Sequence, residues 1–259
     1  MNKNKTPRVL VIAGSDSSGG AGIQADIKTL TVFKVFSMTA ITAITAQNTN
    51  GVSSVESVSL DLIKNQIDDC VSDIGVDAIK IGMVNKAEIF DLIFETLKKH
   101  QIVKKGIPII LDPVMFAKGG FPLLENHAIS ALKEFINKVD CIITPNIPEA
   151  ETLSGLKISN KNDMIKAAKT IKINGTSRIL LKGGHLKEID LCDILYDKNI
   201  PIADQAKEVS MVKKFESGVV RDPITISSWK SVGELIKLTQ DLNISGMPVV
   251  NDGDLVGIV

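Results

Sequence analysis

The segment from Ala13 to Asp26 constrains the fold more than any other part of the sequence. It follows the aliphatic run Val9–Ile12, which predicts a buried strand, and it carries glycines at positions 14, 19, 20 and 22. Glycines let the backbone turn sharply and approach a ligand closely. A helix is expected from about Gly22, with Asp26 in its first turns and facing back toward the strand end. This order of strand, glycine-rich turn and helix is typical of a ligand site in an open α/β sheet, although an ordinary turn with a solvated Asp26 also fits so short a motif.

Predicted strands and helices alternate through most of the chain. We expect strands at residues 9–12, 38–45, 51–58, 78–81, 107–111, 141–143, 178–181 and 189–196. We expect helices at residues 22–33, 60–73, 86–99, 124–138 and 162–173. This alternation predicts the α/β fold class, with a mainly parallel sheet that helices cover on both faces.

Seven side chains lie near the predicted carboxyl ends of these strands, where an open parallel sheet binds its ligands. They are Asp26, Gln47, Met83, Asp112, Asn146, Glu149 and Lys182. Each of them alone could be a cap or a turn former. Their shared location predicts a single site along one edge of the sheet.

The blocks that carry these residues resemble those of a known family. The first block is 13–26, and the others follow in the order 40–48, 79–83, 111–115, 144–150 and 181–185. Together they are similar to the hydroxymethylpyrimidine and hydroxymethylpyrimidine-phosphate kinases of thiamine biosynthesis. The resemblance covers about residues 1–197. It implies the ribokinase-like fold, a doubly wound sheet in three layers (α/β/α).

The resemblance implies that Gly14, Asp26, Gln47 and Met83 bind the pyrimidine. The chemistry of these residues agrees with that role, because the amide of Gln47 can donate and accept and the carboxylate of Asp26 can accept from an amine or hydroxyl. Met83 would supply a soft apolar wall, unless it is only a core residue. Vitamin B6 kinases use the same fold on a similar ring, and the blocks around Gln47 and Met83 favour the thiamine precursor.

The resemblance places ATP and Mg²⁺ at the other strand ends. Asp112 and Glu149 carry carboxylates that suit Mg²⁺ bound through water, and Asn146 and Glu149 would line the nucleotide side. Lys182 precedes two glycines and could reach a phosphate, so Lys182 and Asp112 are the candidate catalytic residues. Asn146 could equally cap the helix that follows it, which would not prevent contact with a ligand.

One element of the family pattern is missing from the printed sequence. The family carries a Gly-Thr-Gly-Cys block near its C-terminus, whose backbone N–H groups bind the transferred phosphate. No such block follows Tyr196, and no cysteine follows Cys192. The kinase part is therefore expected to be truncated and its turnover impaired. The alternative is a catalytically inactive protein that binds a pyrimidine or nucleotide, or two gene fragments joined together.

Residues 198–259 show a second resemblance. Segments 199–209 and 212–218 resemble the part of inosine monophosphate dehydrogenase that leads into its regulatory insert. The remainder resembles an incomplete cystathionine-β-synthase-type (CBS) module that ends in two strands joined by an Asp-Gly turn. We therefore expect two parts, a kinase domain over 1–197 and a linker with a partial CBS module over 198–259.

The composition excludes some classes of partner. The 30 basic and 30 acidic residues leave no net charge, which argues against binding to nucleic acid or an anionic membrane. No apolar run approaches the roughly 18 residues of a membrane-spanning helix. The polar start shows no signal peptide, and three scattered cysteines favour a cytoplasmic protein. The family resemblance implies a small-molecule substrate and a homodimer.

Overall fold

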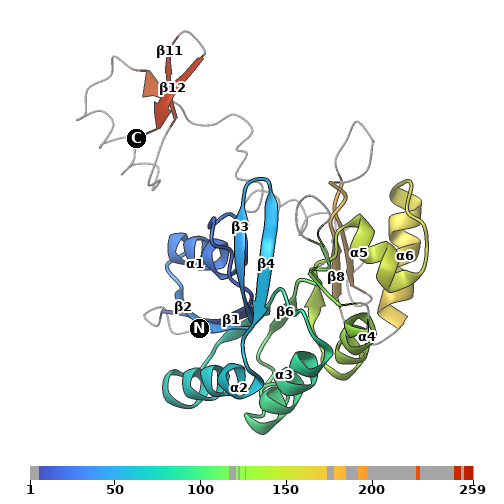
Figure 1. Ribbon diagram of the computed structural model, residues 1–259. Helices are drawn as coiled ribbons and strands as arrows, with labels where there is room; N and C mark the ends of the chain where they lie inside the picture. The colour runs from blue at the N-terminus through green and yellow to red at the C-terminus, as the bar shows by residue number, and fades with distance from the viewer. Residues whose placement is uncertain are drawn as a thin grey trace. The chain divides into compact units, whose positions relative to one another are not determined.

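The computed structural model describes residues 6–116, 121, 123–125, 127–173, 178–184, 192–197, 226–227, 248–251 and 254–258. The chain divides into two compact units, residues 1–209 and 210–259 (Figure 1). All predicted site residues belong to the first unit. None of the described helices has the length and apolar character needed to cross a bilayer.

The first unit is built on a seven-stranded sheet with the order β2-β1-β5-β6-β7-β8-β9. Its strands are β1 (Arg8–Ala13), β2 (Phe36–Ile41), β5 (Ala78–Ile81), β6 (Ile109–Leu111), β7 (Ile142–Ile143), β8 (Arg178–Leu181) and β9 (Ile194–Asp197). Neighbouring strands run parallel except β8 and β9, which are antiparallel. The predicted mainly parallel α/β sheet is confirmed.

Helices connect the strands of this sheet. They are α1 (Gly22–Val32), α2 (Leu60–Asp69), α3 (Ala87–Lys99), α4 (Ala128–Lys138), α5 (Ile147–Ser154) and α6 (Lys161–Ile173). A short π-helix, η1 (Cys70–Ile74), extends α2. The expected helix over 60–73 is therefore confirmed in extent, although its last turn has a wider hydrogen-bond pattern.

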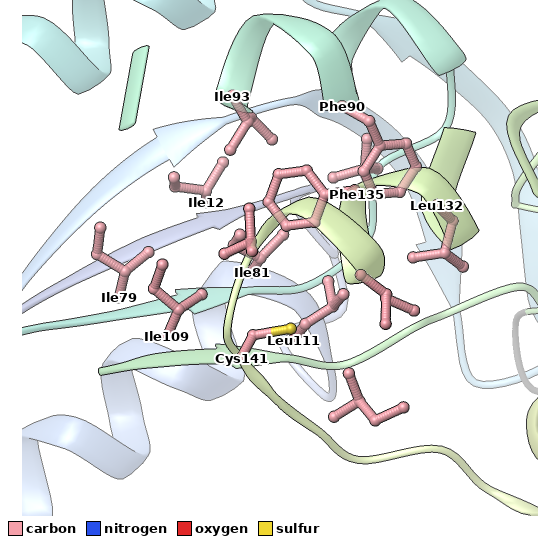
Figure 2. Packing of buried hydrophobic residues seen from close by; sticks show 14 of the residues in the cluster. Ile12, Ile79, Ile81, Phe90, Ile93, Ile109, Leu111, Leu132, Phe135 and Cys141 are labelled. Atoms are coloured by element: carbon pink, nitrogen blue, oxygen red, sulfur yellow. The ribbon is translucent and has the colours of Figure 1, made fainter. Parts of the chain in front are cut away.

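The two faces of the sheet differ in how much apolar surface they bury. Leu10 and Ile12 of β1 join a large core with side chains from α2 to α6, whereas Val11 and Ala13 join a small cluster with Ile23 of α1. Successive strand residues point to opposite faces, which separates the two clusters. Figure 2 shows part of the large core, where the ring centroids of Phe90 and Phe135 lie 5.8 Å apart.

A separate two-stranded hairpin, β3 (Ala43–Asn48) and β4 (Gly51–Ser57), projects from this layered part (Figure 1). We expected one strand over 38–45, but the chain leaves the large sheet at Thr42, between β2 and β3. The Thr42 amide donates to the Ala13 carbonyl (3.0 Å), and its hydroxyl donates to the Met83 carbonyl (2.8 Å). These bonds hold the base of the hairpin against the ends of β1 and β5.

The second unit contains the three-stranded sheet β10-β11-β12. Its strands are β10 (Ile226–Ser227), β11 (Pro248–Asn251) and β12 (Asp254–Ile258). β11 and β12 pair antiparallel, as the sequence predicts. The Asp-Gly turn expected between these two strands lies outside the described residues.

Candidate active site

The carboxyl ends of the parallel strands form a continuous edge. Backbone N–H groups just past one strand donate to carbonyl oxygens at the end of a neighbouring strand: Gly82 to Ile12 (2.9 Å), Asp112 to Ile81 (2.8 Å), Thr144 to Leu111 (3.1 Å) and Lys182 to Pro145 (2.8 Å). These backbone bonds fix the order in which the candidate side chains stand. The end of β5, which leads to Met83, therefore lies beside the end of β6, which leads to Asp112. Asn146 lies beside Lys182 in a parallel β-bridge.

Asp16 organises the glycine-rich loop after β1. Its buried carboxylate accepts from the hydroxyl and amide of Ser18 and from the amides of Gly20 and Ala21, at 2.7 to 3.1 Å. Burial alone would raise the pKa of Asp16, but these hydrogen bonds outweigh it and hold the pKa below its ordinary value. A carboxylate that is already ionised and fully bonded sets the shape of the loop and is not free for a ligand.

Gly22 allows α1 to begin directly beside the loop. It has a φ of +57°, and a Cβ at this position would lie 2.6 Å from the Gly14 carbonyl oxygen. The same carbonyl accepts from the Ile23 amide at 3.0 Å. A side chain at position 22 would break this close approach, so the spacing between Gly14 and α1 depends on glycine.

Gly14 and Met83 are in contact. A Cβ added to Gly14 would lie 3.1 Å from both Sδ and Cε of Met83, whose side chain is buried but belongs to neither hydrophobic cluster. The Thr42 bond to the Met83 carbonyl fixes the backbone at this point. Met83 thus lies against the backbone of Gly14 and could form an apolar wall there.

Asp26 lies on α1 and is paired with a lysine that the sequence analysis did not single out. Lys80 Nζ of β5 lies 2.7 Å from Asp26 Oδ2. This is the only hydrogen bond of the Asp26 carboxylate among the described residues, so Oδ1 remains available to accept from a ligand.

We expected Gln47 just beyond the end of a strand, but it lies within β3. The Ser17 hydroxyl donates to the backbone carbonyl of Gln47 and accepts from the backbone N–H of Gln47, both at 2.8 Å. The Thr45 hydroxyl donates to the Ser15 carbonyl (2.7 Å) and lies 3.3 Å from Gln47 Oε1. These bonds attach the hairpin to the glycine-rich loop, which brings Gln47 to the same side of the site as Gly14.

Asp112 and Lys182 form the centre of the second half of the site. Lys182 Nζ and the Thr144 hydroxyl each lie 3.2 Å from Asp112 Oδ1. Both charged side chains are roughly one-third exposed, so the pair is open to solvent and to a ligand. An ammonium beside a carboxylate at a strand end can contact a phosphate while the carboxylate holds it in place.

Asn146 and Glu149 form a capping box at the start of α5. The Glu149 amide donates to Asn146 Oδ1 (3.0 Å), and the Asn146 amide donates to Glu149 Oε2 (2.8 Å). Burial raises the pKa of Glu149 to about 7, and the charge of Asp112 adds to this effect, while hydrogen bonds from Asn146 and Met115 and the charge of Lys182 oppose it. Glu149 therefore changes protonation near neutral pH.

The donor set of Asp112 and Glu149 fits a magnesium ion that binds together with a polyphosphate. Within the described part of the chain, His, Cys, Asp and Glu side chains form no group of three or more that could hold a metal alone. Mg²⁺ at phosphoryl-transfer sites needs only one or two carboxylates, because water and phosphate oxygens complete its coordination. The negative charge of Asp112 contributes to the raised pKa of Glu149, which is consistent with the two carboxyl groups being near each other.

The structure thus places the predicted residues in two groups along one edge. Gly14, Asp26, Gln47 and Met83 surround the ends of β1, β3 and β5, whereas Asp112, Asn146, Glu149 and Lys182 follow β6, β7 and β8. Sequence reasoning missed four residues that hold these groups: Asp16, Thr42, Lys80 and Thr144. Only Asp16 carried a recognisable signal, since an Asp before Ser-Ser-Gly-Gly favours a turn closed by its own side chain.

Comparisons with known proteins agree with this arrangement. The family model described as phosphomethylpyrimidine kinase matches residues 16–220, which extends past residue 197, where we expected the resemblance to end. A thiamine biosynthesis bifunctional protein from Geobacter sulfurreducens is 45% identical over 189 residues, which is 73% of this chain and 38% of that protein. The hydroxymethylpyrimidine/phosphomethylpyrimidine kinase of Bacillus subtilis is 44% identical over 191 residues, 73% of this chain and 69% of that kinase.

Solved structures show the same likeness. The crystal structure of phosphomethylpyrimidine kinase from Clostridium difficile is 46% identical with a TM-score of 0.68, covering 76% of this chain and 82% of that one. The pyridoxal kinase of Staphylococcus aureus in complex with AMP-PCP and pyridoxal is 34% identical with a TM-score of 0.65, covering 75% and 69%. Since the family match spans most of the sequence and both halves of the strand-end site, the chain belongs to the phosphomethylpyrimidine kinase family.

Proposed function

We propose that this chain transfers the γ-phosphoryl group of ATP to 4-amino-5-hydroxymethyl-2-methylpyrimidine and to its monophosphate, as a kinase of thiamine biosynthesis. The observation that carries the proposal is the row of strand ends, which brings side chains suited to a pyrimidine ring to the same sheet edge as side chains suited to phosphates. The Bacillus subtilis kinase that is named for this activity is 44% identical to the chain over 191 residues.

The first group suits the ring and its hydroxymethyl arm. Asp26 Oδ1 can accept from the amino group or the hydroxyl, and the Gln47 amide can pair with a ring nitrogen and an amino group. Met83 and the backbone of Gly14 provide a flat apolar wall on which the ring can lie. Pyridoxal carries hydroxyl groups and an aldehyde but no amino group, so the aminopyrimidine offers Asp26 a donor that pyridoxal lacks.

The second group suits the reacting phosphates. Phosphoryl transfer depends mainly on positioning and on neutralising charge at the transferred group. Lys182 would contact a phosphate oxygen, while Asp112 and Thr144 fix its direction. Asp112 and Glu149 would hold Mg²⁺ through water, and the ion would supply charge neutralisation when it is bound. Asn146 would contact the nucleotide from the start of α5.

The direct test is ATP-dependent phosphorylation of the pyrimidine by the purified, folded chain. We expect turnover in the wild type and in Lys138→Met, a control that removes an exposed ion pair on α4. We expect losses of at least about 100-fold in kcat/KM for Lys182→Ala and Asp26→Ala, as for the removal of a group that contacts the reacting substrate. Wild-type protein that binds the pyrimidine without phosphorylating it would favour the binding-protein alternative and contradict the kinase assignment.

We further propose the division into a kinase part over 1–197 and an inosine monophosphate dehydrogenase-like linker with a partial CBS module over 198–259. The resemblance of the tail supports this proposal, as does the pairing of β11 with β12. Sequencing the transcript across codons 195–200 tests it. An uninterrupted message supports a natural fusion, and two separate messages mean that fragments were joined artificially.

The proposed kinase would work in the cytoplasm as a homodimer. The family resemblance supports both statements, and neither depends on the site geometry. Light scattering on the full chain at micromolar concentration distinguishes a dimer from a monomer of 27.9 kDa.

A further inference from the structure

Lys80 occupies an unusual position for a lysine in a central strand. Its neighbours Ile79 and Ile81 are fully buried in the large core, so Lys80 points to the opposite face of β5. That face carries α1, and the Lys80 side chain runs toward Asp26 on this helix. A charged side chain in a central parallel strand requires a partner, because both faces of such sheets are ordinarily apolar.

The Lys80 ammonium is held on two sides. Its Nζ lies 2.7 Å from Asp26 Oδ2, and both side chains are about three-quarters buried, with exposed fractions of 25% and 22%. On the other side, a Cβ added to Gly82 would lie 2.7 Å from the same Nζ. The ammonium therefore sits against the backbone of Gly82, the residue before Met83, and links the end of β5 to the second turn of α1.

This contact fixes the orientation of the Asp26 carboxylate. Without Lys80, the carboxylate could rotate freely, since no other described residue donates a hydrogen bond to it. With Lys80 bound to Oδ2, Oδ1 is the oxygen that is directed away from the pair. A charge-assisted bond of this length is among the stronger side-chain contacts in proteins, and it holds a fixed geometry.

Stability alone gives a weak reason for this pair. Ion pairs that keep access to water contribute little to folding, typically about 0 to 1 kcal/mol. An aliphatic residue at position 80 would pack on the same strand face without any desolvation cost. The geometry therefore points to a role in ligand binding more than to a role in folding.

We propose that Lys80 is a positioning residue for pyrimidine recognition, which acts by orienting Asp26 so that Oδ1 accepts a hydrogen bond from the amino or hydroxymethyl group of the substrate. This inference rests on the proposed function. It assigns to Lys80 no contact with the ring, with ATP or with a transferred phosphate. The alternatives are a purely structural ion pair and a direct contact between Lys80 and a substrate phosphate.

A double-mutant cycle between positions 80 and 26 separates these possibilities. The measured quantity is the dissociation constant of hydroxymethylpyrimidine, from calorimetry on the full chain without ATP. Lys80→Met should raise this constant about tenfold, a coupling typical of residues that share one hydrogen-bond network. In the Asp26→Asn background, the same substitution should change it less than about twofold, because the group that Lys80 orients has lost its charge.

Two further variants control the experiment. Lys80→Arg keeps a cation and should bind within about threefold of the wild type, although its fork has a different geometry. Lys138→Met removes an equivalent charge from α4 and should leave pyrimidine binding unchanged. In turnover assays, Lys80→Met should raise the KM for the pyrimidine while the KM for ATP stays constant. Thermal unfolding checks that each variant is folded, and Lys80→Gln, which retains a donor, replaces Lys80→Met if that variant unfolds.

The outcomes are distinct. A wild-type chain that does not bind the pyrimidine overturns the proposed function and this inference with it. If the wild type binds and Lys80→Met binds equally well, only the role of Lys80 is overturned. An equal loss in the wild-type and Asp26→Asn backgrounds also overturns it, because Lys80 would then act independently of Asp26.

Discussion

Among single residues, Glu149 has an environment that strongly alters its chemistry. It is 3% exposed, and burial raises its pKa to about 7 from an ordinary value of 4.5. The folded state therefore holds a proton that the unfolded state releases between these two values. Its contribution to stability is complete below pH 4.5, falls as the pH rises to about 7, and then stays constant.

We predict that Glu149→Gln removes this pH dependence. The amide oxygen of glutamine can still accept from the Asn146 amide, so the cap of α5 is retained. Relative to the wild type, the variant should gain up to about 3 kcal/mol in free energy of unfolding between pH 4.5 and pH 8, from 1.36 kcal/mol for each pKa unit. Urea unfolding at both pH values, with a chelator present, measures this difference. A constant difference would mean that Glu149 stays ionised throughout.

Five of the seven predicted side chains were accessible to sequence reasoning because they come after strands with a clear pattern, whereas Gln47 lies within β3 and Asp26 lies on α1. Lys80 was not accessible in this way, because within the short run Ala78–Ile81 it looks like an outward-facing strand residue. Its importance depends on α1 lying across that face, which is a tertiary contact. The contact of His100 is likewise tertiary, because its ring lies 2.6 Å from Asp68, a residue 32 positions away.

At the scale of elements, Asp68 connects α2 to α3. Its carboxylate contacts Lys64, Lys99 and His100 at 2.6 to 3.0 Å and is only 16% exposed. Burial alone would raise the pKa of Asp68, but the hydrogen bonds from Lys99, His100 and Lys64 outweigh it and lower the pKa well below 3.8. A depressed carboxylate pKa stabilises the fold above pH 3.8, and this stabilisation is lost as the pH falls further.

We expect Asp68→Asn to lower the free energy of unfolding by about 2 kcal/mol at pH 7, the size of hydrogen bonds to charged groups. Asp91→Asn, an exposed change on α3, should have little effect and serves as the control. The difference in free energy of unfolding between Asp68→Asn and the wild type should become smaller below pH 3.8, because the wild type then loses the contribution of the ionised carboxylate. Chemical denaturation across this range tests the prediction, and a gap independent of pH would contradict it.

Two glycines with a left-handed backbone allow the cost of backbone strain to be measured apart from the cost of steric overlap. Gly155 ends α5 with a φ of +73° and open space around it, whereas Gly22 has a φ of +57° and the Gly14 carbonyl beside it. Gly155→Ala should cost about 1 kcal/mol, the penalty for a Cβ in this conformation. Gly22→Ala should cost at least about 2 kcal/mol more, because the added carbon overlaps backbone atoms. Equal losses in denaturant titrations would show that the loop before α1 can move aside.

The elements themselves followed from hydrophobic periodicity, with differences of a few residues at their ends. The exception was the region 38–45, whose continuous β-branched sequence concealed the change of sheet at Thr42. Local propensity cannot detect this change, because residues on both sides of Thr42 remain in strands. It arises from hydrogen bonds of Thr42 to Ala13 and Met83, which are distant in the sequence.

For the whole molecule, the two faces of the seven-stranded sheet are covered to different extents by helices. Among the described residues, α1 is the helix that buries side chains on one face, while α2 to α6 contribute to the core on the other. Ile109 and Ile110 are neighbours in β6 that point to opposite faces. Ile109 is 2% exposed and belongs to the large core, whereas Ile110 is only partly buried.

This asymmetry predicts that an isoleucine-to-alanine substitution lowers the free energy of unfolding by different amounts on the two faces of the sheet. Ile109→Ala should lower the free energy of unfolding by about 3 kcal/mol, because it leaves a cavity in the core. Ile110→Ala should cost about 1 kcal/mol, since less buried surface is lost. The two variants share one strand, so the loss of β propensity is matched. Equal costs would mean that the Ile110 face is covered as well as the other.

The attachment of the β3–β4 hairpin has a consequence for protein engineering. The chain enters the hairpin after Thr42 and returns at Val58, whose amide donates to the Thr42 carbonyl at 3.0 Å. Its first and last residues, Ala43 and Ser57, are directly paired. The two ends of the hairpin thus lie side by side, so a chain from which the hairpin is removed needs no long linker between Thr42 and Val58. The hairpin can therefore be exchanged as a cassette between related vitamin kinases, carrying Gln47 with it while the sheet keeps its path.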